Sequence, residues 1–132
     1  MLFLVLFIPG SVWAIASPLF AVPDEDAHVV KAVAVWCGHL GGDDVRREDG
    51  YVFTTYALPA VWRQANSNPE CFKFKREVTA GCAPPLSTLD ATPEATTGVG
   101  TTAGHYPPLY YALIGWGGRL RAGRRGCISC GS

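Results

Sequence analysis

Residues 1–22 read MLFLVLFIPGSVWAIASPLFAV and contain no charged side chain. A helix of this length would rise about 33 Å, which is enough to cross a hydrocarbon core of about 30 Å. Its backbone amides would bond within the helix and need no water in the bilayer. The segment therefore predicts an N-terminal transmembrane helix, or signal-anchor, with the lipid bilayer of the cell membrane as its partner.

The same segment also has one feature of a cleavable signal peptide. Ala14-Ile15-Ala16 precedes Ser17 in the small-x-small pattern of a cleavage site. No Lys or Arg precedes the apolar run, which favours a retained helix, and a buried helix of a soluble domain is the third alternative. The first two interpretations both place residues 23–105 in an extracytoplasmic loop.

Charge is unevenly divided along the chain. All 11 acidic residues lie between Asp24 and Glu94, whereas Arg119, Arg121, Arg124 and Arg125 follow without an acid. Such a separation of acidic from basic residues along the chain bears on how the chain is oriented in a membrane. No basic stripe carries interleaved aromatic residues, so the sequence gives no support for a nucleic-acid partner.

The loop is expected to begin with an amphipathic helix over about residues 24–38. Asp24 can cap the helix, and Glu25 and Asp26 suit the positive end of its dipole. An apolar stripe recurs at helical spacing. Its members are Val29, Val30, Val33, Trp36, Cys37 and Leu40.

The rest of the loop is less regular. Residues 43–50 read as a charged loop, residues 51–56 as a strand, and Pro59 opens a short helix. Residues 86–104 are rich in Thr, Ala, Gly and Pro and are expected to form a flexible connector. Residues 106–118 then resemble the start of a second membrane helix that is too short to span a bilayer.

Cys71 and Cys82 enclose ten residues. In an oxidising compartment they would form a disulfide, which is worth about 3 kcal/mol in the chain-entropy model. Two free thiols are the alternative.

Residues 119–132 form an atypical tail rich in Arg and Gly. Cys127 and Cys130 make a lone C-x-x-C pair, which is weak evidence for zinc or redox chemistry. The abrupt change of composition suggests a truncated or frame-shifted product of a longer gene.

Four motifs together resemble a bacterial membrane-protein family, the domain of unknown function 2142. They are Ser17-Pro18-Leu19-Phe20, Pro23-Asp24-Glu25-Asp26-Ala27-His28, the late cysteine pair, and Tyr106-Pro107-Pro108-Leu109-Tyr110-Tyr111-Ala112. The resemblance covers about residues 10–116. It implies a polytopic protein allied with the GT-C glycosyltransferases, of which this chain would be an N-terminal fragment that is inactive alone.

The resemblance also implies a site. In GT-C enzymes an acidic residue just after the first helix is a catalytic base or metal ligand, and Asp24 and Glu25 occupy that position. His28 would support them, and a divalent cation shared by the three side chains is a candidate cofactor. The substrate would be a polyprenyl-phosphate sugar. The alternative is a purely structural role, in which Asp24 caps the helix while Glu25 and Asp26 are solvated charges.

The sequence thus predicts a mainly α membrane fold. Its parts are one N-terminal transmembrane helix, an extracytoplasmic loop with an amphipathic helix and a disulfide, and the start of a second membrane helix. The alternative function is a secreted or membrane-anchored, disulfide-containing binding module without catalysis.

Overall fold

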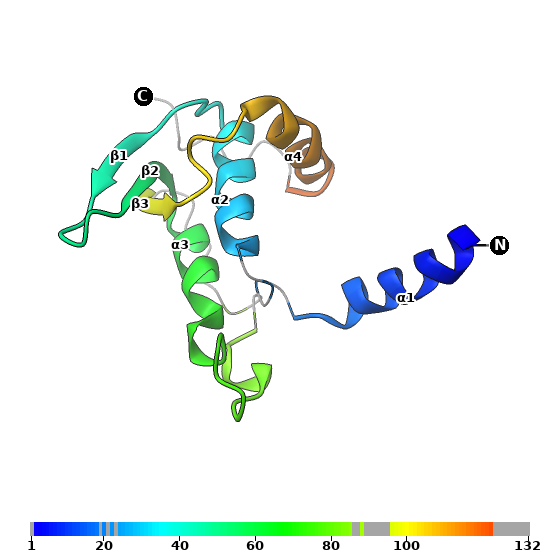
Figure 1. Cartoon of the computed structure of the whole chain (residues 1–132). Helices are drawn as coiled ribbons and strands as arrows, with labels where there is room; N and C mark the ends of the chain where they lie inside the picture. The colour runs from blue at the N-terminus through cyan, green and yellow to red at the C-terminus, as the bar shows by residue number, and fades with distance from the viewer. Residues whose placement is uncertain are drawn as a thin grey trace.

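The computed structural model describes residues 2–18, 20, 22, 24–85, 88 and 96–122. An apolar helix, α1 (Leu2–Ala16), projects from a body in which helices pack around a small sheet (Figure 1). The side chains of α1 are almost all exposed. The candidate site described below is formed by residues of the body, from α2, α3 and α4.

The sheet consists of three antiparallel strands in the order β1-β2-β3. They are β1 (Asp43–Arg46), β2 (Val52–Pro59) and β3 (Thr96–Thr101). In β2, Thr54, Tyr56 and Leu58 are buried, which is the alternation that a half-buried strand requires. Tyr56 lies opposite Val99 of β3, so both strands present apolar side chains on one face.

Helix α2 (Glu25–Trp36) covers that face of the sheet and forms the core with it. The core side chains come from α2, β2 and β3; they are Val30, Val33, Ala34, Tyr56, Leu58 and Val99. On its other side α2 packs against α4 (Pro108–Ala122), and α3 (Ala60–Ser67) follows β2 (Figure 1). Helix α2 is thus the central element of the body.

Helices α2 and α4 approach closely at Gly115. A Cβ atom there would lie 3.1 Å from the carbonyl oxygen of Ala32, so a larger residue would push the helices apart. This contact holds the middle of α4 against the C-terminal half of α2.

The prediction of a mainly α membrane fold with a transmembrane helix was wrong. Within the described part of the chain, no helix is both long enough and apolar enough to cross a membrane. Helix α1 has 15 residues and ends at Ala16, because Pro18 disfavours the helical conformation at Ser17. The three-stranded sheet is a second departure from that fold.

Several local predictions are confirmed. The amphipathic helix is α2, the strand is β2, and the short helix after Pro59 is α3. Cys71 and Cys82 form the expected disulfide.

Two predicted loops were wrong in part. Residues 43–46 form β1 instead of belonging to a charged loop, and Thr96–Thr101 form β3 within the expected flexible connector. Residues 86, 87 and 89–95 of that connector, and residues 123–132 with Cys127 and Cys130, lie outside the described residues.

Candidate functional site

The first turn of α2 brings the predicted site residues to one end of the body. Asp24 precedes the helix with φ 65° and is exposed, and its side chain makes no capping hydrogen bond. A capping residue normally has an extended backbone, from which its oxygen reaches back to the helix amides. The left-handed conformation of Asp24 does not suit that geometry, so the capping prediction was wrong.

Glu25 is the half-buried carboxylate of the group. Its Oε2 accepts a hydrogen bond of 3.4 Å from the backbone amide of Val22, just before the helix. The Glu25 side chain also borders an apolar cavity, described below. It is the one predicted carboxylate that meets both polar backbone and apolar space.

Asp26 is engaged elsewhere. Its Oδ2 lies 2.9 Å from Nζ of Lys73, in an ion pair whose side chains are largely buried. This ion pair ties the start of α2 to the loop closed by the disulfide. Asp26 is therefore a structural residue.

His28 is held by two tyrosines that precede or begin α4. Its Nδ1 lies 2.7 Å from the hydroxyl of Tyr111, and its ring stacks on both Tyr111 and Tyr106. The Tyr111 ring is buried, and burial is the main cause that raises the pKa of its hydroxyl, with smaller contributions from Tyr106 and Tyr110. The neutral Tyr111 hydroxyl thus fixes the orientation of the imidazole.

An open apolar cavity of about 300 Å³ lies between α2, α3 and α4. Its wall is made of aromatic and aliphatic side chains, with Glu25 and His28 as its polar members. The lining residues are Glu25, His28, Val29, Ala32, Val33, Trp36, Trp62, Ile114 and Gly115. An apolar hollow with a few polar groups is the usual form of a small-molecule site.

The shared metal site expected for Asp24, Glu25 and His28 is not formed. Among the described residues, no group of three or more His, Cys, Asp or Glu side chains is arranged to hold a metal ion. Glu25 and His28 share the cavity wall, whereas Asp24 is not among the lining residues.

Four aromatic residues of the site were not predicted from the sequence. They are Tyr106 and Tyr111, which hold His28, and Trp36 and Trp62, which line the cavity. The Tyr106–Ala112 motif marks the two tyrosines in the sequence. However, His28 and Tyr111 are 83 residues apart, so their spacing in the sequence could not show that they are in contact.

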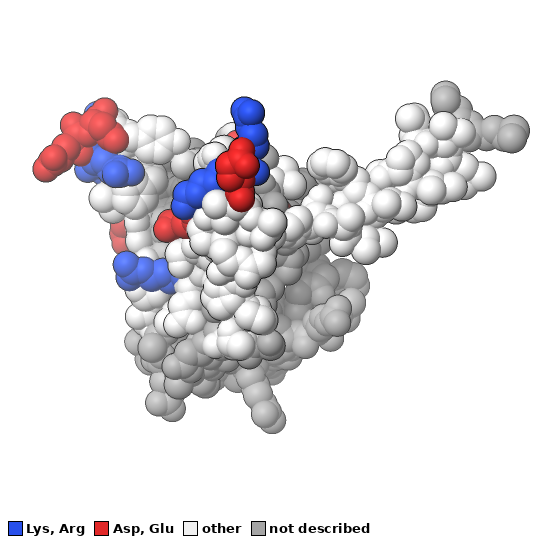
Figure 2. Space-filling view, turned by 90° about the horizontal axis from the view of Figure 1, so that it is seen from below, with Lys and Arg blue, Asp and Glu red and all other residues white. Residues whose placement is uncertain are grey.

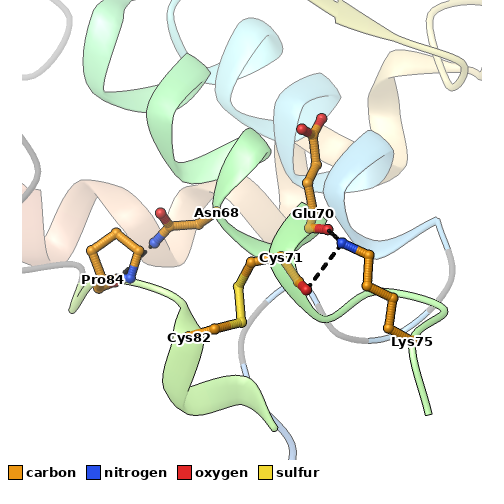
Figure 3. Close-up of a disulfide and its surroundings, with 6 residues drawn as sticks. All are labelled: Asn68, Glu70, Cys71, Lys75, Cys82 and Pro84. Carbon is orange, nitrogen blue, oxygen red and sulfur yellow. Dashed lines mark hydrogen bonds between the residues drawn. A yellow bond between two sulfur atoms is a disulfide. The ribbon is translucent and has the colours of Figure 1, made fainter. Parts of the chain in front are cut away.

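The disulfide closes a loop beside this end of the body (Figure 3). Lys75 donates hydrogen bonds to the carbonyl oxygens of Glu70 and Cys71, and the Asn68 amide donates to the carbonyl oxygen of Pro84. Both chain segments next to the bridge are therefore fixed by further hydrogen bonds.

Comparison with known proteins gives one match. Residues 7–123 match the model of a family described as "Predicted membrane protein (DUF2142)". No curated protein and no solved structure matches the chain.

Proposed function

The chain belongs to the DUF2142 family of predicted membrane proteins, and we propose that its body lies on the outer side of the cell membrane and acts in sugar transfer from a polyprenyl-phosphate carrier. Membrane localisation follows from the family. The side of the membrane, the substrate and the residue roles are our proposal.

The disulfide supports the outer side of the membrane. Cys71 and Cys82 form a disulfide. Disulfides persist in oxidising compartments and are rare in the cytosol. A topology reporter joined after Gly104 tests this placement: alkaline phosphatase should be active there and a fluorescent protein dark. The reverse pattern would refute it.

The apolar cavity is the observation that carries the proposed substrate class. A polyprenyl-phosphate sugar has an isoprenoid chain that needs an apolar surface and a polar head that needs hydrogen-bonding groups. The cavity offers Trp36, Trp62 and Ile114 for the first, and Glu25 and His28 at its wall for the second. A lipid-linked substrate fits both features.

In this proposal Glu25 is the general base. Its carboxylate takes the proton of an acceptor hydroxyl while the acceptor oxygen forms a bond to the anomeric carbon of the sugar. The bond from that carbon to the phosphate oxygen breaks, and its electron pair leaves with the polyprenyl phosphate. Glu25 is preferred to Asp24 because it borders the cavity.

His28 is assigned a supporting role. Tyr111 holds its Nδ1, which leaves Nε2 for the substrate phosphate or for the Glu25 carboxylate. Asp24, which is exposed beside Glu25, is the second candidate for the base.

Substitution of the carboxylate tests catalysis. In membranes that contain the whole protein, Glu25→Gln should lower transfer from a radiolabelled polyprenyl-phosphate hexose about a hundredfold or more. Asp24→Asn should have a smaller effect, and Asp49→Asn, in the turn between β1 and β2, should have none. Unchanged transfer by both Glu25→Gln and Asp24→Asn would sink the catalytic role and favour a binding module without catalysis.

Filling the cavity tests substrate binding separately. Ala32 lies in its wall, and Ala32→Phe would occupy part of the space without touching either carboxylate. Undecaprenyl phosphate is the probe, and its affinity for the reconstituted chain should fall at least tenfold. If Ala32→Phe binds the probe as the parent does, the cavity is not the site of the isoprenoid.

A further inference from the structure

The loop between Cys71 and Cys82 presents an aromatic ring that has no place in the core. Phe74 is 87 % exposed and has φ 63°. A positive φ is uncommon for any residue with a side chain, and for a bulky one it is an outlier. The disulfide-closed loop therefore holds an apolar ring outward at a conformational cost, which points to a partner outside the chain.

Basic residues lie next to this ring in the sequence. Between the two cysteines the chain carries Lys73, Lys75 and Arg76 against a single acid, Glu77. Lys73 is held by Asp26 and lies over the Phe74 ring, with its Nζ 5.7 Å from the ring centre. Lys75 and Arg76 are exposed. The tip of the loop thus combines an apolar ring with positive charge.

The loop lies where α1 joins the body. A shallow hollow is lined by Pro18, just after α1, together with Phe72, Lys73, Phe74 and other residues of the loop. Helix α1 is white along its described length in Figure 2, whereas charged side chains gather over the body. The exposed apolar helix and the basic, aromatic loop therefore occupy neighbouring surfaces.

We propose that residues 72–81 bind the headgroup region of an anionic bilayer. Phe74 enters the boundary between headgroups and acyl chains, and Arg76 contacts lipid phosphates. Lys75 adds positive charge beside them, and its ammonium keeps one donor beyond its bonds to Glu70 and Cys71. Phe side chains beside Lys and Arg bury at this boundary in surface-bound segments, and each basic side chain near an anionic surface adds to binding. The proposal concerns how the body sits on the membrane and does not depend on the role of Glu25.

Photo-crosslinking from the loop tests this placement. The full chain is made with benzoylphenylalanine at position 74, or at Tyr51 as the control, and is reconstituted into phosphatidylglycerol-containing vesicles. Tyr51 is also an exposed aromatic residue, but it lies at the β1–β2 turn. Lipid adducts at position 74 should exceed those at position 51 by about tenfold, the ratio that corresponds to 1.4 kcal/mol of preference.

The charge component is varied through the lipid and the salt, so it needs no further substitution. Adducts at position 74 should fall severalfold on vesicles of phosphatidylcholine alone, and on anionic vesicles in high salt, because salt screens exposed charges. Equal yields at the two positions, equal yields on the two kinds of vesicle, or adducts to protein in place of lipid would each overturn the proposal.

Discussion

Tyr111 joins α4 to the start of α2, because its hydroxyl lies within hydrogen-bond distance of His28. Its side chain is only 2 % exposed. Ionisation of this hydroxyl would place a phenolate in a poorly solvated position, which is why burial raises its pKa. The folded state therefore holds the proton more tightly than the unfolded chain does, and the stability it contributes is present below the ordinary tyrosine pKa of about 10.

We predict that the free energy of unfolding falls as the pH rises above about 10, the range in which the unfolded chain releases this proton first. Tyr111→Phe should lower stability by about 1 kcal/mol at neutral pH, through loss of the hydrogen bond to His28, and should flatten the alkaline decline. Urea titrations in detergent across the pH range measure both effects. Tyr51, beside the β1–β2 turn, is 55 % exposed and does not affect the Tyr111 pKa, so Tyr51→Phe should keep the parental profile. A Tyr111→Phe protein with the parent's alkaline decline would contradict the prediction.

Lys31 is a buried residue whose ammonium joins several segments of the body by hydrogen bonds. Its side chain is 1 % exposed, and its ammonium donates to the carbonyl oxygens of Leu40 and Gly104 and to the hydroxyl of Tyr56. These acceptors come from three separate segments, so Lys31 ties α2 to the sheet and to the turn before α4.

Lys31→Met would keep the apolar stem but leave the buried Tyr56 hydroxyl and the carbonyl oxygens of Leu40 and Gly104 without their donor. The expected loss is about 1–3 kcal/mol of unfolding free energy, the cost of unpaired buried polar groups. Lys75→Met removes donors from two carbonyl oxygens at an exposed position and should cost less. Equal losses from the two variants, measured by urea denaturation, would show that burial of Lys31 is not the cause.

At the scale of elements, the turn after β3 lies directly on β2. A Cβ atom at Gly104 would overlap the side chain of Thr54, whereas one at Gly41 would meet nothing within 4 Å. Gly104 is thus required for the close approach that brings its carbonyl oxygen to Lys31.

We expect Gly104→Ala to lower the midpoint of thermal unfolding, with a loss of about 1–3 kcal/mol from overpacking. Gly41→Ala is the matched control and should change stability by less than about 1 kcal/mol. Thermal scans followed by circular dichroism compare the two. Similar midpoints for Gly104→Ala and the parent would mean that the turn can move away from β2 at little cost.

The elements that the sequence predicts well have strong periodicity. Helix α2 has an apolar stripe, and β2 has a run of β-branched and aromatic residues. Strand β3 reads TTGVGT, with two glycines and one large apolar residue, so nothing in its composition separates it from a linker. It is a strand because β2 supplies its hydrogen bonds and Val99 completes the core.

The site was predictable only where its residues are close in sequence. The cluster from Asp24 to His28 stood out, but the partners that give each member its role come from the loop near Lys73 and from α4. Capping of the helix by Asp24 failed because the backbone at that residue is left-handed, and residue type alone does not reveal this.

At the scale of the whole molecule, the loop closed by the disulfide contacts α2, lies beside the end of α1 and carries an exposed aromatic ring. It contacts the start of α2 through the Lys73–Asp26 ion pair, it borders the end of α1 near Pro18, and its tip carries Phe74. The left-handed conformation of Phe74 is unfavourable for a bulky residue in a free chain. The covalent bridge should therefore matter for loop geometry as well as for stability.

The paired substitution Cys71→Ser/Cys82→Ser tests this. Removing the bridge should lower the free energy of unfolding by about 3 kcal/mol, because the unfolded chain regains the freedom of a closed loop. The lipid adducts from position 74 should fall together with stability, whereas undecaprenyl phosphate binding in the cavity should persist in the folded fraction, since residues of α2, α3 and α4 line that cavity. Urea titration, photo-crosslinking and probe binding on one preparation give all three readouts. Undiminished adducts in the folded fraction would show that the ion pair and the hydrogen bonds of Lys75 suffice to hold the loop, and loss of probe binding would show that the bridge supports the cavity.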